Sequence, residues 1–369
     1  MNILIINLIL TTAEKGVITR RKSIKDTMAC SLGEGFVENG HKVTIVASED
    51  FKPTKSESYP FEIIYFKSRY PKLFRPDLLP CPIGLKRWLK LHCNEYDLVV
   101  SSENFSIGSL IASLVCKKKL VIWQEMAQHQ RKFHQMPSKF WYNVVNGLFM
   151  KGVLAVPRSR DAHRFISQYC RNVSKEIVDN GANGKILYPS AKKDKSFMIL
   201  SQLIPRKRVD TMITQFAKLV SMPRYADYTL NVIGDGILAT DLKQQAIDLN
   251  VGEKVVFHGF LRHRDLAEML RKSTALLVNT ARDLNMVSIN ESIISGTPVV
   301  MNTVPTTASF VANHRLGIVQ DNWDEKQLVE VIENNAQFHE ACLNVRDSLT
   351  NVGCARKLIE IYTRGKSAY

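Results

Sequence analysis

The sequence lacks an uninterrupted apolar run long enough to cross a membrane. A membrane-spanning helix needs about 20 apolar residues, and the longest candidate, MNILIINLIL at residues 1–10, has about half that length. No basic residue precedes this run and no cleavage site of small residues follows it, as a signal peptide would require. We therefore expect residues 1–10 to form a buried first strand.

Cysteine occurs at seven positions but never as a Cys-x-x-Cys pair. Scattered cysteines in odd number argue against a disulfide framework and against a zinc site. The sequence also has no His-x-x-x-His pair, no Asp-x-Asp motif and no Gly-x-Gly-x-x-Gly fingerprint, which leaves divalent metals and dinucleotides without a recognisable site. We expect a protein of the reducing cytoplasm that uses no metal and no cofactor.

Acidic residues are scarce in the first half of the chain. Residues 1–200 hold 31 Lys+Arg against 17 Asp+Glu, whereas residues 201–369 hold 19 against 18. Such a basic surface binds an anionic partner, either phospholipid head groups or nucleic acid. Its richest stretch, residues 66–90, interleaves cations with Tyr70 and Trp88, as is typical of a membrane interface. Because no nucleic-acid module accompanies the charge, we expect an anionic membrane surface and no nucleic acid; a solvated basic face is the alternative.

Strand-like apolar runs alternate with helical stretches along the whole chain, and 369 residues favour two domains. This alternation predicts an α/β fold of two Rossmann-like, doubly wound domains, whose ligands bind at the carboxyl ends of the strands. The polar segment 179–196 separates the halves. We expect an N-terminal domain over residues 1–188 and a C-terminal domain over residues 189–351. A last helix at about 352–369 could belong to either domain, and we favour its packing back on the first.

The segment RDLNMVSINESIISGTPVV, residues 282–300, combines carboxylates with helix punctuation. Ser288 followed three residues later by Glu291 matches a capping box, and Gly296 then ends the predicted helix. Capping does not explain Asp283, which follows an apolar strand and so reaches the carboxyl edge of the sheet, where it can accept hydrogen bonds from the hydroxyls of a ligand.

Free N–H groups at the start of the same helix are expected near Met286, Val287 and Ser288. Unpaired donors and the helix dipole stabilise an anionic diphosphate at such a position.

The second half resembles the C-terminal domain of retaining nucleotide-sugar glycosyltransferases of family 4, over about residues 175–320. The motifs that carry the resemblance are VDNGAN, LSQLIPRKRVDTMITQFAKL, LNVIGDG, VVFHGFL and the segment 282–300. The resemblance implies the GT-B fold, in which two Rossmann-like domains face each other across a cleft. It also implies that Asp283 contacts hydroxyls of the donor sugar and that Glu291 contacts the ribose, although the family has Glu at the first position.

The loop SQLIPRKRVD is the candidate phosphate site, because fixed cations stabilise the negative charge that develops on a leaving diphosphate. Lys207 falls where the family keeps a phosphate-binding lysine, but Gln202 replaces the family's arginine. Arg206 or Arg208 is a candidate replacement for that cation. The alternative is a basic loop ahead of a helix, which the helix dipole disfavours.

Several loop residues after other strands are weaker candidates. Gly259, like Gly234, either lets the backbone approach the nucleotide base or makes a turn, and the resemblance places Gly16 near the diphosphate or the acceptor. Glu125 and His129 follow an apolar strand and are candidates for orienting the acceptor hydroxyl; solvated loop residues are the alternative. The family's histidine just after this strand is missing here.

We therefore expect a retaining, metal-independent glycosyltransferase that moves a sugar from a nucleotide diphosphate sugar to a glycan or lipid-linked acceptor. Its expected setting is polysaccharide or glycolipid assembly, in the cytoplasm or peripherally on the inner face of the membrane. One alternative is a non-catalytic nucleotide-sugar-binding protein with a degenerate site, and another is an epimerase or phosphorylase of the same fold. A nucleic-acid-binding protein ranks after these.

Overall fold

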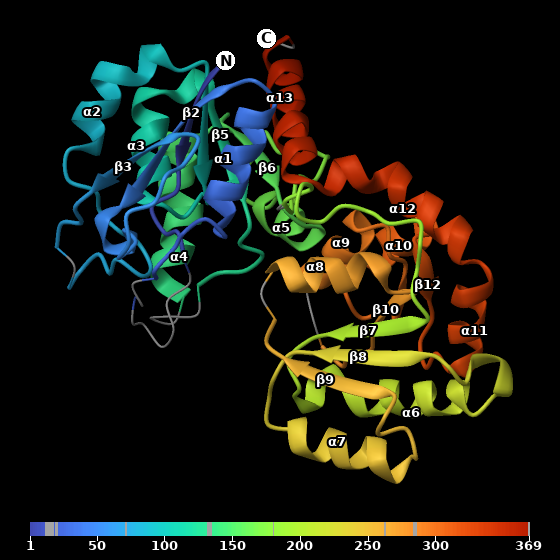
Figure 1. Ribbon diagram of the computed structural model, residues 1–369. Coiled ribbons are helices and arrows are strands. Elements are labelled where there is room, and N and C mark those ends of the chain that lie inside the picture. The colour runs from blue at the N-terminus through green and yellow to red at the C-terminus, as the bar shows by residue number, and fades with distance from the viewer. Residues whose placement is uncertain are drawn as a thin grey trace. The chain divides into compact units, whose positions relative to one another are not determined.

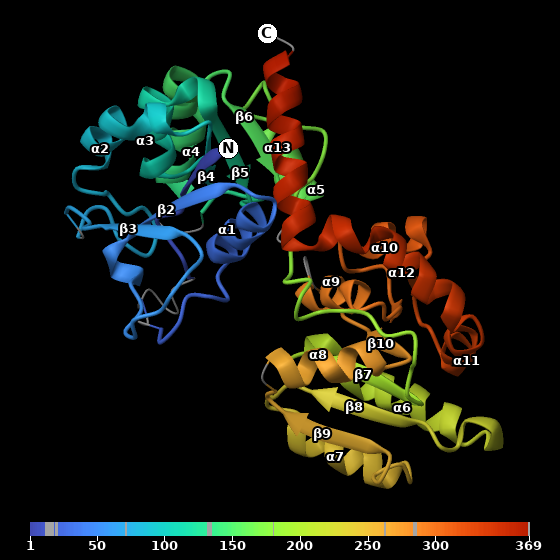
Figure 2. The same ribbon diagram turned by 45° about the horizontal axis from the view of Figure 1, so that its top comes forward.

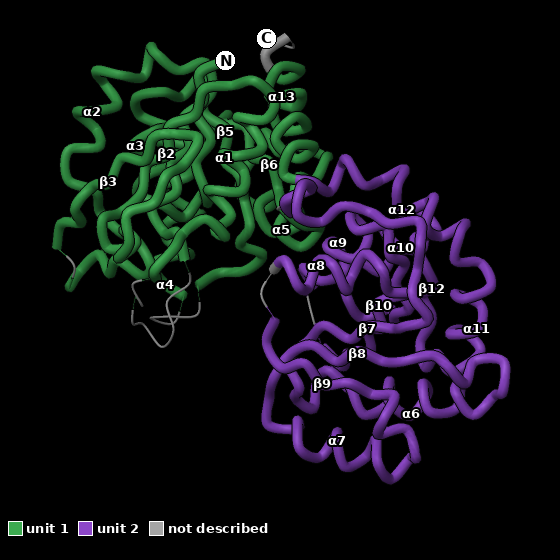
Figure 3. Tube along the Cα trace, viewed as in Figure 1, with its two compact units in different colours: residues 1–181, 351–369 green, residues 182–350 purple. Residues whose placement is uncertain are grey.

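The computed structural model describes residues 1–11, 18, 21–70, 72–130, 135–179, 181–261, 263–282 and 286–367. The chain forms two compact units (Figure 3). Unit 1 comprises Met1–Gly181 with Asn351–Tyr369, and unit 2 comprises Ala182–Thr350. The division thus falls a few residues before the boundary expected at 188, and the last helix belongs to unit 1.

Unit 1 is built on a six-stranded sheet in the order β3-β2-β1-β4-β5-β6 (Figures 1 and 2). Every neighbouring pair is parallel. The central strands are continuous Val, Ile and Leu runs, because a parallel sheet covered by helices is buried on both faces. The strands are β1 (Asn2–Ile6), β2 (Lys42–Ser48), β3 (Glu62–Phe66), β4 (Leu98–Ser102), β5 (Leu120–Gln124) and β6 (Leu154–Pro157).

Helices cover both faces of this sheet, as the alternation of side chains along β1 shows. Ile3 and Ile5 pack in one core with α1 (Met28–Glu38) and α13 (Asn351–Ser367). Leu4 and Ile6 point to the opposite face and a second core. The elements packed in that core are α2 (Leu85–His92), α3 (Ile107–Val115), the π-helix η5 (Trp141–Met150) that continues α4 (Met136–Phe140), and α5 (Arg160–Ile166).

The last helix, α13, is held to the rest of unit 1 by hydrogen bonds from side chains to backbone carbonyls. Asn39 Nδ2 donates to the carbonyl of Val352 at 2.9 Å, and the hydroxyl of Tyr362 donates to the carbonyl of Asp97 at 2.7 Å. A Cβ atom on Gly35 would lie 2.2 Å from the carbonyl oxygen of Asn351, so the glycine allows α1 to approach α13 closely.

One cysteine pair is an exception to the expectation of no disulfide framework. Cys93, which follows α2, is paired with Cys116, which follows α3, and their Cα atoms lie 6.1 Å apart. The spacing of the two cysteines in the sequence carries no signal for this pair, because the contact depends on the packing of α2 beside α3.

Unit 2 repeats the arrangement with the order β12-β11-β10-β7-β8-β9, again with parallel neighbours throughout. Its strands are β7 (Ser196–Leu200), β8 (Thr229–Ile233), β9 (Val255–Gly259), β10 (Ala275–Val278), β11 (Val299–Met301) and β12 (Gly317–Val319). The helices α6 (Val209–Val220), α7 (Ala239–Asp248) and α11 (Glu325–Glu333) pack on one face. Those on the other face are α8 (His263–Lys272), α9 (Val287–Ile294), α10 (Ala308–His314) and α12 (Asn335–Leu349).

The prediction of two Rossmann-like domains is therefore confirmed. In each unit the first strand in sequence lies at the centre of the sheet. The strand order reverses beside it, between β1 and β4 in unit 1 and between β7 and β10 in unit 2. Ligands of open α/β sheets bind beyond the carboxyl ends of the strands at such a switch point. Within the described part of the chain, no helix is both long and apolar enough to cross a membrane.

Candidate functional site

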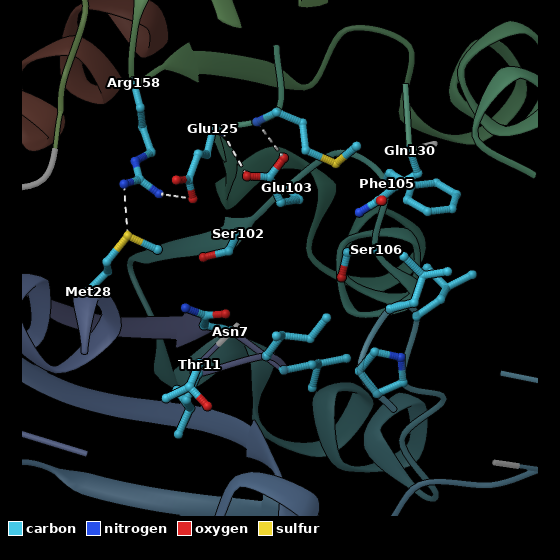
Figure 4. A pocket seen from close by; sticks show the side chains of 17 residues that line it. Asn7, Thr11, Met28, Ser102, Glu103, Phe105, Ser106, Glu125, Gln130 and Arg158 are labelled. Carbon is cyan, nitrogen blue, oxygen red and sulfur yellow. Dashed lines mark hydrogen bonds and ion pairs between the residues drawn. The ribbon is translucent and has the colours of Figure 1, made fainter. Parts of the chain in front are cut away.

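A pocket of about 210 Å³ lies at the switch point of unit 1 (Figure 4). Its walls come from the residues that follow β1, β4, β5 and β6, from the start of α1, and from the loop 78–80. Its lining is rich in amide, hydroxyl and carboxylate groups, which suit a ligand with several hydroxyls. The polar lining residues are Asn7, Thr11, Ser102, Glu103, Ser106, Glu125, Gln130 and Arg158.

Glu103 is the most perturbed acid of this pocket. Its carboxylate accepts hydrogen bonds from the backbone N–H groups of Glu125 at 2.8 Å and Met126 at 3.1 Å. Its backbone is left-handed, with φ of 66°, which is uncommon for a residue other than glycine. Burial, reinforced by the charge of Glu125 and opposed by these hydrogen bonds, raises the pKa of Glu103 to about 7. The pocket thus holds a carboxyl group that changes charge near neutral pH.

The predicted acceptor-site residue Glu125 lines the pocket beside Glu103. Its carboxylate pairs with Arg158 at 2.6 Å, and the arginine is buried while the glutamate is half-exposed. The Arg158 guanidinium also lies over the ring of Trp123, 4.6 Å from the centroid. Its buried Nε has no hydrogen-bond partner among the described residues. The buried Arg158 therefore holds the exposed Glu125 carboxylate in place at the pocket.

His129, the other predicted acceptor-site residue, does not line this pocket. Its ring nitrogens lie 3.0 Å from the hydroxyls of Ser138 and Tyr169, and its ring packs edge-on against Tyr142 and Phe165. Burial, together with the nearby charge of Lys139, lowers the pKa of His129. Both nitrogens are thus engaged within the fold, which favours a structural role over the predicted catalytic one.

The sequence interpretation overlooked Glu103 and Arg158. Both follow apolar strands, in VVSSE at 99–103 and VLAVPR at 153–158, so the rule that strand ends meet at one edge could have identified them. What the sequence does not show is that the backbone N–H groups after β5 turn towards Glu103.

In unit 2, the loop after β7 is tied to the loop after β10 at the switch point. The carbonyl of Arg206 accepts hydrogen bonds from Ala281 N at 2.8 Å and from the Thr280 hydroxyl at 3.1 Å. The Arg206 guanidinium donates to the carbonyl of Arg282 at 3.1 Å. The predicted phosphate loop is therefore held against the segment that leads to α9.

The cations of this loop differ in their surroundings. Lys207 ends a short 3-10 helix (Pro205–Lys207) and is buried, with 8% of its surface exposed. Arg206 reaches back to Gln202, whose Oε1 lies 3.4 Å from the Arg206 Nη2. Arg208 has a left-handed backbone and stands at the start of α6. Arg206 is therefore the better placed of the two arginines to compensate for the missing cation at Gln202.

Helix α9 differs at its start from the sequence prediction. It begins at Val287 with Met286 as the N-cap residue, and no side chain caps it. The predicted capping box is therefore wrong, since Ser288 lies within the first turn. The side chain of Met286 makes no capping hydrogen bond, and the role of Met286, Val287 and Ser288 in anion binding stays a prediction. Glu291 is buried in the next turn, at 8% exposure.

The end of α9 agrees with the prediction. Gly296 has φ of 67°, its N–H donates to the carbonyl of Ile293 at 3.0 Å, and Thr297 N donates to the carbonyl of Ser292 at 2.9 Å. These are the two hydrogen bonds of a Schellman motif, which ends a helix at a left-handed glycine.

The two loop glycines of unit 2 have different roles. A Cβ atom on Gly234 would lie 1.8 Å from the carbonyl oxygen of Ser201, so this glycine is required by chain packing. Gly259 has φ of 64° with open space around it, and its carbonyl accepts a hydrogen bond from Gly234 N at 2.9 Å. Only Gly259 combines a turn with room for a ligand.

Two predicted site residues, Asp283 and Gly16, lie outside the described residues. Among the residues that the structure describes, no group of three or more His, Cys, Asp or Glu side chains is arranged to hold a metal ion.

Comparison with known proteins finds a family model that resembles most of unit 2. Residues 186–337 match the family model of the glycosyl transferases group 1. The chain is similar to the alpha-monoglucosyldiacylglycerol synthase of Streptococcus pneumoniae, with 22% identity over 247 residues that cover 60% of this chain and 55% of that protein. The chain thus spans about half the length of this relative.

Solved structures show the same fold over the whole chain. Sucrose-phosphate synthase from Thermosynechococcus elongatus matches with a TM-score of 0.61 and 14% identity, covering 100% of both chains. Anabaena HepE in complex with UDP matches with a TM-score of 0.62 and 14% identity, covering 99% of this chain and 100% of that one. The fold of this chain is therefore the GT-B fold.

Proposed function

Because residues 186–337 match the family model of the glycosyl transferases group 1, we propose that the chain transfers a sugar from a nucleotide diphosphate sugar held by unit 2 to an acceptor held by unit 1. The observation that carries the proposal is the loop of Arg206 and Lys207, fixed by hydrogen bonds at the switch point of unit 2. Cations held in place before the reaction stabilise a departing diphosphate without reorganisation.

In the proposed donor site, Lys207 and Arg206 neutralise the diphosphate and the first turn of α9 donates N–H groups to it. Glu291 accepts from the ribose hydroxyls, Asp283 contacts the sugar, and Gly259 leaves room for the base. The complex of HepE with UDP supports this type of donor for a protein of the same fold. These cations take the place of a divalent metal in the proposal, so chelators should not change the rate.

The proposed reaction retains the configuration at the anomeric carbon. The acceptor hydroxyl attacks the face from which the diphosphate leaves, so the bond from the anomeric carbon to the phosphate oxygen breaks as the bond to the acceptor oxygen forms. The hydroxyl proton passes to the leaving phosphate. Glu125 orients the acceptor through a hydrogen bond and does not become covalently attached to the sugar.

For the acceptor we propose a glycan or a lipid-linked molecule that places its hydroxyls in the pocket of unit 1. The polar lining of the pocket suits a polyol, and the similar synthase of Streptococcus pneumoniae is named for a glycolipid product. The basic segment 66–90 would meet an anionic membrane, with Tyr70 and Leu73 exposed at 62% and 77%. We propose that the protein acts at the cytoplasmic face of the membrane.

A thermal-shift screen of UDP, ADP and GDP tests the donor site. A nucleotide at a hundred times its Kd should stabilise the protein by about 2.7 kcal/mol. Glu291→Gln should weaken this stabilisation, whereas Glu253→Gln, an exposed acid before β9, should leave it intact. If no nucleotide diphosphate stabilises the wild type, the proposed donor site is wrong.

A non-catalytic nucleotide-sugar-binding protein is the second candidate, because Gln202 replaces a cation at the phosphate site. It predicts nucleotide binding without release of nucleotide diphosphate from any sugar nucleotide that binds. Measuring that release for each ligand found in the screen separates the two candidates. Arg206 Nη2 lies 3.4 Å from Gln202 Oε1. This contact favours the transferase, since Arg206 brings a cation to the position where the family has an arginine.

A further inference from the structure

An apolar stripe runs along the outside of α4 and η5. Met136, Phe140, Val144 and Leu148 recur every four residues, about one helical turn, and are exposed by 64%, 59%, 39% and 69%. The opposite side of the same segment is buried through Trp141, Tyr142 and Met150 in the core of unit 1. A large contiguous apolar patch on a solvent-exposed surface indicates an interaction site.

The segment that carries this stripe, α4 with η5, contains Lys139 and no acidic residue. The helices α2, α3 and α4 and the π-helix η5, which share one face of the sheet, contain no Asp or Glu. Exposed cations lie on these elements or at their ends, namely Lys86, Arg87, Lys90, Lys117, Lys118, Lys139 and Lys151, whereas α5 on the same face carries Asp161. A symmetric dimer through this face would bring like charges together, whereas an anionic bilayer accepts both the apolar side chains and the cations.

The stripe is connected to the wall of the unit 1 pocket through Asn104. The Trp141 Nε1 donates to the carbonyl of Asn104 at 2.9 Å, and Asn104 Nδ2 donates to Asn146 Oδ1 at 2.9 Å. The neighbours of Asn104 in sequence, Glu103 and Phe105, both line the pocket. Phe105 also packs edge-on against Trp141, with ring centroids 5.4 Å apart.

We propose that the α4–η5 stripe inserts into the head-group region of an anionic bilayer and thereby holds the unit 1 pocket at the membrane surface. Phe140 and Leu148 are the main apolar contacts, and the lysines at either end of the segment contact lipid phosphates. The inference rests on the proposed function and deepens it, because it adds the α4–η5 stripe to the basic segment 66–90 as a surface through which unit 1 would meet the membrane that holds a lipid-linked acceptor. Binding to lipid itself does not require that the transferase activity be correct.

Co-sedimentation with vesicles of phosphatidylcholine and phosphatidylglycerol tests the proposal. The double variant Phe140→Ser/Leu148→Ser should bind about ten- to a hundred-fold more weakly, because two apolar side chains lose their burial in lipid. The matched control Ile247→Ser/Val256→Ser changes two exposed apolar residues of unit 2 and should bind as the wild type does. Phe140→Trp/Leu148→Trp, which keeps large interfacial side chains, should retain binding.

Three results would overturn the proposal. One is a wild type that does not bind these vesicles, and another is a double serine variant that binds them equally well. The third is a wild-type dimer in light scattering that the serine substitutions convert to a monomer, because the stripe would then cover a second copy. Thermal shifts by UDP, ADP and GDP on the same variants report the donor site separately, so failure of the stripe and failure of the proposed function give different results.

Discussion

In unit 1, strands β4 and β5 lead to Glu103 and Glu125, whereas in unit 2 strand β7 leads to Arg206 and Lys207. The two sheets have the same strand order and a switch point in the same place. Their edges nevertheless differ in charge: the edge of unit 1 carries two carboxylates, one of them paired with Arg158, whereas the edge of unit 2 carries two cations. The basic excess lies within residues 1–200, while residues 201–369 are almost neutral.

This difference separates two kinds of electrostatic information. The net charge of a surface indicates what the whole domain meets, such as an anionic membrane. The charge at a strand edge indicates what a ligand must supply, since fixed carboxylates accept hydrogen bonds from hydroxyls and fixed cations bind phosphate. One fold can therefore serve a polyol in one unit and a nucleotide diphosphate in the other without any change of topology.

Removing the buried cation of unit 2 should give the largest effect. We expect Lys207→Met to lower the rate of sugar transfer by about a hundred- to a thousand-fold, because the developing charge on the diphosphate loses a fixed partner. The control, Lys218→Met, removes an exposed lysine from α6 and should leave the rate within about twofold. Initial rates of nucleotide diphosphate release measure both. Equal rates for the wild type and Lys207→Met would show that Lys207 does not stabilise the leaving diphosphate.

The carboxylate edge of unit 1 should make stability depend on pH. The folded protein holds the Glu103 proton more tightly than the unfolded chain, because burial raises its pKa from 4.5 to about 7. Stability is therefore unaffected by this group below pH 4.5, falls as the pH rises towards 7, and stays lower above it. The full shift corresponds to about 3 kcal/mol.

Glu103→Gln should remove this part of the pH dependence. The variant loses one of two hydrogen bonds from Glu125 N and Met126 N, at a cost of about 1 kcal/mol that does not depend on pH. Urea unfolding at pH 5 and pH 8, followed by tryptophan fluorescence, measures the difference. An identical pH slope in wild type and variant would show that the carboxyl group titrates normally.

Unit 1, unlike unit 2, includes a helix from the end of the chain, α13, which packs against α1. Gly35→Ala would place a Cβ atom against the Asn351 carbonyl oxygen, forcing α1 and α13 apart. We expect a loss of about 1–3 kcal/mol in the free energy of unfolding of unit 1. Gly147→Ala, at a position with open space in η5, is the matched control and should not destabilise. If both variants have the same free energy of unfolding, the close approach of α1 and α13 does not contribute to the stability of unit 1.

Periodicity was sufficient to predict both sheets, whereas the family resemblance singled out Lys207 in the cationic loop of unit 2. The run FMILSQL and the alternation after it locate β7 and α6, because buried parallel strands leave continuous apolar runs. The site in unit 1 was only half predicted. Glu125 follows a strand visibly, but its pairing with Arg158 joins residues 33 positions apart, which no local pattern encodes.

Local chemistry was misleading at the start of α9. Ser288 and Glu291 have the spacing of a capping box, yet the helix begins one residue before Ser288. A real capping box occurs at α11, where Asp324 accepts from Lys326 N and Gln327 accepts from Asp324 N. Both sequences fit the pattern, but only Asp324 stands at the N-cap position of its helix.

This contrast gives the smallest and most specific test of the unit 2 edge. Ser288→Ala should change the free energy of unfolding by less than about 0.5 kcal/mol, because no cap is lost and alanine favours the helix. Asp324→Ala, which does remove a cap, should cost about 1 kcal/mol. If the first turn of α9 binds the diphosphate, Ser288→Ala should still weaken UDP binding several-fold in calorimetry while Asp324→Ala does not. If Ser288→Ala lowers stability but not UDP affinity, Ser288 acts as a cap and the first turn of α9 does not bind the diphosphate. If it lowers UDP affinity but not stability, the first turn of α9 is a binding element of unit 2. The carboxylates of unit 1 then have no counterpart to it.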